Sequence, residues 1–477
     1  MCKFSQSYSR WNQKKRIILL HKEQKASQIA IFQKFRLIIS VFTAIFALHL
    51  FLMKVILINT SEKKGGAAVA CGRLMRALQK ADAEADMLVR DKSTDNPHVI
   101  AANKGKTAHW LNQFRFVWER LSIFLQNGLD RKNLFAVSIA NSGIPLAAHP
   151  AVKSADIIHL HWINQGFLSL NQIKKLAKTG KPIVWTMHDM WPATGICHHS
   201  RECESYHTRC EKCMFLGNKQ SKDLSTRVFL RKKEIWANAN IHFVTCSRWL
   251  EKRTRASALI NPNNVQAIPN PLDTGFYSPK DKNEARKQFG LPPNKKLILY
   301  GAANVTDKRK GIDYYVDACR ILSEKYPRAN EELELVFFGQ AKENIDGLFP
   351  FPIHQTGYLT DDETIRNLYN AVDLFVTPSL EENLPNTIME SMSCGTPVVG
   401  FSIGGIPEMI DHQQNGFLSD YKSAAHLAEG VDWCLWKADY QALSTNARKK
   451  VIECYSEEAV AEKYIQLYRH ILLKNTK

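Results

Sequence analysis

The segment from 373 to 401 constrains the fold more strongly than any other part of this chain. It predicts a strand at 373–377, a polar loop, a helix that begins at Pro385 or Asn386, and a second apolar strand after Gly395. A strand, a helix and a strand in close succession are typical of one half of a doubly wound parallel sheet. In open sheets of this kind, ligands bind beyond the carboxyl ends of the strands, where the polar loop lies.

The same alternation of strands and helices runs through the rest of the chain. The first half predicts strands at 55–59, 156–162, 182–188 and 241–246 and helices at 67–78 and 248–257. The second half predicts further strands at 297–301, 333–339 and 396–401 and helices at 311–326, 362–371 and 387–394. Alternation of this kind predicts an α/β fold with a doubly wound parallel sheet in each half.

A chain of 477 residues is long enough for two such domains. Turns rich in Pro, Asn and Asp from 262 onwards indicate the change from one domain to the other. We predict an N-terminal Rossmann-like domain at 53–275 and a C-terminal Rossmann-like domain at 276–455. The last helix, within 456–477, is expected to pack back on the N-terminal domain.

Residues 1–52 have the composition of an extension rather than of a domain. They contain nine Lys and Arg residues against one acid, Glu23, and the sequence turns apolar from 37 to 53. This apolar stretch is at the lower length limit for a transmembrane helix, so a membrane anchor is one interpretation. Because Met53 opens the first expected strand, we expect it to be the true start, with 1–52 outside the native fold.

The net charge of +18 is spread unevenly, because residues 1–52 account for +8 of it. The remaining charge fits a phosphorylated substrate or an anionic membrane surface as well as a nucleic acid. No recognition motif for nucleic acid is present, so we expect no nucleic acid partner; a basic nucleic-acid-binding protein with a cysteine cluster is the distant alternative. The basic runs Lys174-Lys175 and Arg231-Lys232-Lys233 suit peripheral contact with an anionic inner leaflet.

Two carboxylates, Glu382 and Glu390, bracket the polar loop and the first turns of the helix that follows it. Carboxylates accept hydrogen bonds from hydroxyl groups, which sugars carry in number. The first helical residues, Asn386 and Thr387, present free N–H groups and positive partial charge to a phosphate. The segment therefore indicates a nucleotide that carries a sugar, although each acid taken singly is also typical of a surface position.

Three further groups lie where expected strands end. Gly65-Gly66 allows the backbone to approach a phosphate or a sugar closely, or serves simply as a turn. His188 is able to donate to a sugar hydroxyl, or is a structural histidine bonded to nearby backbone. Lys310, with Arg309 beside it, is able to neutralise a diphosphate, or belongs to a solvated basic loop.

The two acids in this context resemble the retaining glycosyltransferases of family 4, group 1. The motifs that carry the resemblance around Glu382 and Glu390 are Cys-Gly-Thr-Pro-Val-Val at 394–399, Gly-Gly-Ile-Pro-Glu at 404–408 and Asn-Gly-Phe-Leu at 415–418. The resemblance extends to Gly65-Gly66, His188, Ile-Pro-Asn-Pro-Leu-Asp at 268–273 and Lys310-Gly311, and so covers nearly all of 53–470. It implies the GT-B architecture, two facing Rossmann-like domains.

The resemblance also implies an activity: transfer of a sugar from a UDP- or GDP-linked donor to a glycan or lipid-linked acceptor, with retention and without a catalytic metal. By this likeness Glu382 contacts the transferred sugar, Glu390 the ribose and Lys310 the diphosphate, while His188 faces the sugar from the acceptor domain. The implied setting is assembly of cell-surface polysaccharide or lipopolysaccharide in the cytoplasm, at the inner face of the membrane. A nucleotide-sugar epimerase of the same architecture is the alternative.

Two departures from the family pattern affect the donor site. Where the family commonly has Gly-Phe-Gly after the first acid, this chain has Asn383-Leu384-Pro385, and a proline has no N–H to offer a donor. The family often has an arginine shortly before Lys-Gly, where this chain has Asn-Val-Thr-Asp at 304–307. Arg309 is therefore our candidate for the second cation at the diphosphate.

Four cysteines gather in one short segment, at positions Cys197, Cys203, Cys210 and Cys213. Only the last pair has the spacing usual for zinc ligands, and three histidines are interleaved with the cysteines. A structural zinc, disulfide or redox chemistry, and free thiols are the three interpretations. For the other cysteines we expect small apolar core residues in a reducing compartment.

Overall fold

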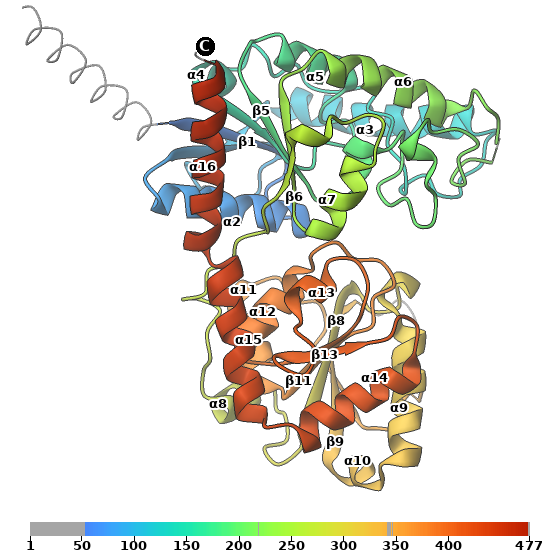
Figure 1. Cartoon of the computed structure of the whole chain (residues 1–477), viewed down its shortest axis with the longest axis vertical. Coiled ribbons are helices and arrows are strands. Elements are labelled where there is room, and N and C mark those ends of the chain that lie inside the picture. The colour runs from blue at the N-terminus through green and yellow to red at the C-terminus, as the bar shows by residue number, and fades with distance from the viewer. Residues whose placement is uncertain (1–52, 218, 341–344, 346, 476–477) are drawn as a thin grey trace, which may run out of the picture. The chain divides into compact units, whose positions relative to one another are not determined.

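The computed structural model describes residues 53–475, apart from 218, 341–344 and 346. The predicted extension 1–52 lies outside the described residues, and with it the question of a membrane anchor there. From Lys54 onwards the chain forms one compact unit that holds two parallel sheets covered by helices (Figure 1). The predicted fold class, α/β with two Rossmann-like doubly wound sheets, is confirmed.

The first sheet has seven parallel strands in the order β3-β2-β1-β4-β5-β6-β7. Their bounds are β1 (Lys54–Ser61), β2 (Glu84–Asp91), β3 (Val99–Ala101), β4 (Ile157–Leu160), β5 (Ile183–Met187), β6 (Ile241–Thr245) and β7 (Val265–Ala267). The strand order reverses between β1 and β4, which pair directly. A crevice at the carboxyl ends of these two strands is where such sheets bind ligands.

The helices between these strands are α2 (Gly66–Lys80), α3 (Lys106–Gln126), α4 (Pro150–Ser154), α5 (Leu170–Ala177), α6 (Leu224–Ala237) and α7 (Arg248–Arg255). The last helix, α16 (Glu457–Asn475), packs against α2 beside this sheet (Figure 1). Its Tyr468 hydroxyl lies 2.6 Å from Nδ1 of His159 on β4, and its Tyr464 hydroxyl lies 2.8 Å from the hydroxyl of Thr186 on β5. The C-terminal end of the chain is therefore part of the first sheet's packing.

The second sheet has six parallel strands in the order β10-β9-β8-β11-β12-β13. Their bounds are β8 (Lys296–Asn304), β9 (Leu333–Gln340), β10 (Ile353–Gln355), β11 (Leu374–Thr377), β12 (Val398–Phe401) and β13 (Gly416–Ser419). The accompanying helices are α8 (Lys282–Gln288), α9 (Ile312–Lys325), α10 (Pro327–Glu332), α11 (Asp362–Ala371), α12 (Asn386–Ser393), α13 (Ile406–Met409), α14 (Ala424–Asp432) and α15 (Tyr440–Tyr455). Here the order reverses between β8 and β11, which places a second crevice at their carboxyl ends.

The strands are buried because helices cover the parallel sheets. Leu57 and Ile58 in β1, and Leu374 and Val376 in β11, have no solvent exposure. Strands that are buried on both faces have continuous apolar sequences, and such runs predict these strands from the sequence. Several helices begin at a side-chain cap; in α7, for example, the Leu250 N–H donates to the Ser247 hydroxyl at 3.1 Å.

No helix in the described part of the chain combines the length and the apolar character needed to cross a bilayer.

Candidate functional site at the carboxyl ends of the two sheets

The loop after β11 positions Glu382 at the edge of the second sheet. Helix α12 begins at Asn386, after Pro385, so Glu382 belongs to the loop and Glu390 lies inside the helix. No side chain caps the N-terminus of α12. Its first N–H groups, at Asn386 and Thr387, therefore have no capping side chain and carry the positive end of the helix dipole.

Two glycines hold this loop in place. Gly311, at the start of α9, has φ +76°, and a Cβ there would overlap the carbonyl oxygen of Pro378. Gly404 has φ +61°, and a Cβ there would overlap the carbonyl oxygen of Glu382. Since only glycine tolerates both the positive φ and the close approach, these positions fix the backbone on either side of Glu382.

Lys310 points at Glu382. Its ammonium group forms an ion pair with Glu382 Oε1, to which the Ser379 hydroxyl also donates at 3.4 Å. Arg309 instead turns to Asp307, with 2.8 Å between Nη2 and the carboxylate. Both Arg309 and Glu382 line a cavity of about 530 Å³. Of the two cations predicted for a diphosphate, Lys310 therefore lies beside the acid, and Arg309 has a carboxylate partner of its own.

Glu390 is buried and fully engaged. Its Oε1 accepts from Arg73 of α2 at 2.7 Å, and its Oε2 accepts from the Tyr369 hydroxyl at 3.2 Å. Arg73 is itself buried and also donates to the Tyr277 hydroxyl at 3.2 Å. Arg73, which was not among the predicted site residues, thus links the first half of the chain to Glu390, the residue predicted to bind the ribose. Each oxygen of the Glu390 carboxylate has a second lone pair, so a ribose hydroxyl would donate to it beside these bonds or displace one of them.

His188 lies just after β5 and belongs to a row of interacting side chains that is largely buried. Its Nε2 is 3.0 Å from Nδ1 of His161, and its Nδ1 is 3.5 Å from the Cys246 sulfur. Burial lowers the pKa of His188 to about 4, against a smaller raising effect from the Asp189 carboxylate. The imidazole is therefore neutral near pH 7, and its one ring N–H is able to donate a hydrogen bond to a hydroxyl.

Side chains from the 382–390 loop reach the first sheet. Asn383 Oδ1 accepts from the Ser247 hydroxyl at 2.6 Å, and its Nδ2 donates to the carbonyl of His188 at 3.2 Å. Asn386 Nδ2 donates to the carbonyl of Gly66 at 3.4 Å. The structure therefore brings Gly66, His188 and the Glu382 loop together, and it gives Asn383, one of the departures from the family pattern, a bridging contact.

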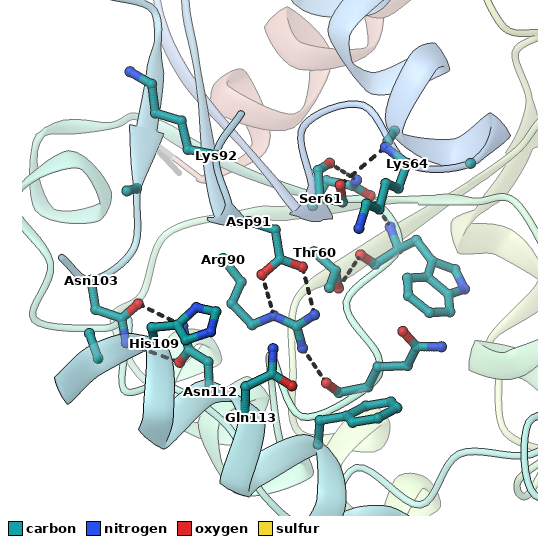
Figure 2. Close-up of a pocket in the computed structure, with 18 of the residues that line it drawn as sticks. Thr60, Ser61, Lys64, Arg90, Asp91, Lys92, Asn103, His109, Asn112 and Gln113 are labelled. Carbon is teal, nitrogen blue, oxygen red and sulfur yellow. Dashed lines mark hydrogen bonds and ion pairs between the residues drawn. The ribbon is translucent and has the colours of Figure 1, made fainter. Parts of the chain in front are cut away.

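A cavity of about 1000 Å³ lies at the carboxyl ends of β1, β2 and β3. Gly65 and Gly66 line it, together with side chains of α3 (Figure 2). Figure 2 shows Arg90 held between the carboxylate of Asp91, at 2.6 Å, and the carbonyl of Gln165. The polar lining residues of β2 and α3 lie on elements that were not predicted from the sequence.

Asp189 connects this cavity to the cysteine segment. It accepts from Trp162 Nε1 at 3.0 Å, from the Trp191 N–H at 2.8 Å and from His198 Nδ1 at 2.7 Å. Burial by itself raises its pKa, but the charges of His198 and His199 and the hydrogen bonds from His198 and the Trp191 N–H together lower the pKa to about 2. Because Trp162 also lines the large cavity, the position of that wall depends on the Asp189 carboxylate.

The four cysteines of the segment are free thiols that line one small cavity. The N–H of Gly195 donates to the Cys210 sulfur at 3.2 Å. Burial raises the pKa of Cys210 to about 12 and that of Cys213 to about 11. As they stand, no three His, Cys, Asp or Glu side chains of the described residues are arranged to hold a metal ion. The structural zinc predicted for Cys197, Cys203, Cys210 and Cys213 stays a prediction.

One basic run differs from the prediction made for it. Lys232, in the middle of Arg231-Lys232-Lys233, is fully buried under the ring of Trp191, at 3.4 Å from the ring centre. Its ammonium group donates to the carbonyls of Trp191, at 2.5 Å, and Thr194, at 3.0 Å. This lysine supports the segment before the cysteines and is not available to a membrane surface.

Comparison with known proteins agrees with this architecture in both halves. Residues 64–276 match the model of Glycosyltransferase Family 4, and residues 294–436 match that of Glycosyl transferases group 1. Among solved structures, Anabaena HepE in complex with UDP and glucose has a TM-score of 0.58 at 16% identity, over 87% of this chain and 99% of that one. The fold and the two family matches support a glycosyltransferase of the GT-B class.

Curated relatives point to the same class. An uncharacterized glycosyltransferase of Methanocaldococcus jannaschii is 25% identical over 328 residues, which cover 67% of this chain and 76% of the relative. The putative colanic acid biosynthesis glycosyl transferase WcaC of Escherichia coli is 22% identical over 336 residues, which cover 69% of this chain and 78% of the relative.

Proposed function

We propose that this chain transfers a sugar from a UDP- or GDP-linked donor to an acceptor, with retention at the anomeric carbon. The observation that carries the proposal is the pair Lys310 and Glu382 at the carboxyl edge of the second sheet, beside the uncapped N-terminus of α12. A cation and free helical N–H groups suit a diphosphate, and a carboxylate next to them suits a sugar hydroxyl. On binding of the donor, the Lys310–Glu382 ion pair would separate, so that Lys310 contacts the diphosphate and Glu382 contacts a sugar hydroxyl.

In the proposed reaction, the C–O bond between sugar and phosphate breaks as the acceptor oxygen approaches from the same face. The departing phosphate oxygen takes the proton of the acceptor hydroxyl, so no separate base is required. Lys310 and the N–H groups of Asn386 and Thr387 would stabilise the charge that develops on the diphosphate. Glu382 would hold the transferred sugar, and neutral His188 would hydrogen-bond it from the other side. This chemistry requires no metal ion.

We place the acceptor in the large cavity next to Gly65 and Gly66. Its polar lining and volume suit a glycan or the head of a lipid-linked sugar. The likeness to WcaC, named for colanic acid biosynthesis, supports a role in cell-surface polysaccharide or lipopolysaccharide assembly. Nucleotide sugars are cytosolic, which supports a reaction in the cytoplasm, and a role in cell-surface assembly would place it at the inner face of the membrane.

The proposal is tested by incubating the chain with a panel of UDP- and GDP-sugars and short lipid-linked or free glycans. Proton NMR of the product should show the anomeric configuration of the donor. Inverted configuration would overturn the retaining mechanism, and an epimerised donor formed without acceptor would identify an epimerase instead.

A further inference from the structure

Helix α3 and the segment after it expose an unusual number of large apolar side chains. Nine of the sixteen exposed large apolar residues of the described chain lie there: Trp110, Leu111, Phe114, Val117, Trp118, Leu121, Leu125, Leu129 and Phe135. Trp110 is 74% exposed and Phe114 is 63% exposed. Single exposed apolar residues are ordinary, but a contiguous group of this kind marks an interaction surface.

The exposed residues of α3 itself form one stripe. Trp110, Phe114, Trp118, Leu121 and Leu125 recur at intervals of three and four, which places them on one side of the helix. The buried positions of α3, among them Ala108, Asn112 and Ile123, recur on the opposite side. The helix is thus apolar where it faces water, the reverse of a helix whose apolar stripe packs on its own core.

Cations lie at both ends of this stripe. Lys104 and Lys106 are exposed at the start of α3, and Arg131 and Lys132 are exposed after its end. Among residues 103–135 there are two carboxylates, and one of them, Glu119, is buried in an ion pair with Arg120 at 3.1 Å. The water-facing side of this region therefore combines apolar side chains with positive charge.

A basic cavity adjoins the same helix. Arg115 of α3 lines a cavity of about 460 Å³ together with three lysines of and just after α5, Lys174, Lys175 and Lys178. Arg115 is next to the stripe on the helix surface, one position from Phe114 and three from Trp118. Lys174 is paired with Glu234 at 2.6 Å, and the other three cations around the opening offer a place for a phosphate group beside the apolar side chains.

We propose that this side of α3 docks on an anionic membrane surface. Tryptophans in an apolar stripe, flanked by Lys and Arg, are the features of a helix that lies in the interface between headgroups and acyl chains. The cations match the negative charge of such a leaflet. A second copy of this chain fits the surface less well, because a symmetric contact through α3 would place the same cations opposite one another.

The side of α3 that faces away from the stripe, with His109, Asn112 and Gln113, lines the large cavity in which the proposed function places the acceptor (Figure 2). The apolar stripe is not part of the lining of that cavity. Docking by the stripe therefore leaves the polar lining free for an acceptor.

The test is sedimentation of the full chain with vesicles of phosphatidylglycerol and, separately, of phosphatidylcholine. The unchanged chain should bind the anionic vesicles, and Phe114→Asp/Trp118→Asp should weaken that binding at least about tenfold. Ile452→Asp, which changes an exposed apolar residue on α15, is the matched control and should bind like the unchanged chain. Lys174→Glu/Lys175→Glu should reduce binding to phosphatidylglycerol and leave any binding to phosphatidylcholine unchanged.

Equal vesicle binding by the α3 variant and the unchanged chain would overturn the proposal and assign any membrane affinity to another part of the chain. A dimer that forms without lipid and dissociates on Phe114→Asp/Trp118→Asp would also overturn it, in favour of a second copy on this surface. Stabilisation by UDP or GDP, measured in parallel on both proteins, should be the same. Its absence from both would count against the proposed function and leave the vesicle result standing.

Discussion

Glu382 is the residue whose environment is most specific to the proposed chemistry. Its backbone is fixed by Gly404, and its carboxylate lies between Lys310 and Ser379. Glu382→Ala and Glu382→Gln should lower transfer by at least about 100-fold, which corresponds to about 2.7 kcal/mol of transition-state stabilisation. Initial rates at saturating donor are the measurement, with Glu453→Ala on the exposed side of α15 as the control.

Donor affinity separates a catalytic from a structural role for Glu382. Because its removal frees Lys310, Glu382→Ala should bind the nucleotide at least as tightly as the unchanged chain. Near-normal turnover in either variant would remove Glu382 from the reaction.

His159 provides a pH-dependent contribution to stability. It is fully buried between the hydroxyls of Tyr468 and Thr186, and burial, with a smaller contribution from His188, lowers its pKa to about 3. The unfolded chain therefore binds one more proton than the folded chain between about pH 3 and 6.5, so the stabilisation is present above pH 6.5 and is lost as the pH falls.

Replacing His159 with Phe should reduce the pH dependence of the free energy of unfolding between pH 4 and 6.5 by up to about one proton per chain. Urea unfolding of both proteins across this range measures the slopes. Above pH 7 the two slopes should agree, whatever the difference in stability between the two proteins. An unchanged slope at low pH would show that His159 is protonated in the folded chain.

At the scale of single elements, α2 and α12 are joined by a buried ion pair. Removing one partner leaves a buried charge without its counter-charge, so Arg73→Met should cost about 3–5 kcal/mol. Removing both charges, in Arg73→Met/Glu390→Gln, should restore most of that loss. Thermal unfolding of the single and double variants tests this coupling, and additive losses would contradict it.

In the cysteine segment, four cysteines that are close together in the sequence are also close together in the structure. All four cysteines line one cavity, and the buried Lys232 packs on the residues just before them in the sequence. If the side chains close on a structural zinc, the purified protein should contain about one zinc per chain, and chelation should lower its melting temperature. Elemental analysis that finds less than about 0.2 zinc per chain would exclude this interpretation.

The sequence predicts elements well wherever apolar residues face the core. Helix α11 and strand β11 lie where the pattern places them, at Asp362–Ala371 and Leu374–Thr377, because a capping acid and a buried apolar run mark their limits. Helix α3 was missed although its large apolar residues recur at helical spacing, and their exposure to solvent is visible only in the structure. Arg73 was missed for another reason: its partner, Glu390, is 317 residues away in the sequence.

At the scale of the whole molecule, contacts between the two halves surround the proposed site. Glu408, from the second half, accepts from the N–H groups of Arg248 and Trp249 at the start of α7, at 2.9 and 2.8 Å. Asn383 and Asn386 make further contacts near His188 and Gly66. Motifs that lie far apart in the sequence therefore meet at one place, which spacing alone does not predict.

The proposed function places a nucleotide sugar at Lys310 and Glu382. The most direct measurement is the thermal stabilisation of the full chain by a panel of UDP- and GDP-sugars, compared with that of Lys310→Ala. A donor at 100 times its dissociation constant should stabilise the unchanged chain by about 2.7 kcal/mol, and Lys310→Ala should lose most of this effect at the same concentration. Equal stabilisation of Lys310→Ala and of the unchanged chain would contradict donor binding at Lys310. The absence of stabilisation of either protein by any of the sugars would contradict donor binding altogether.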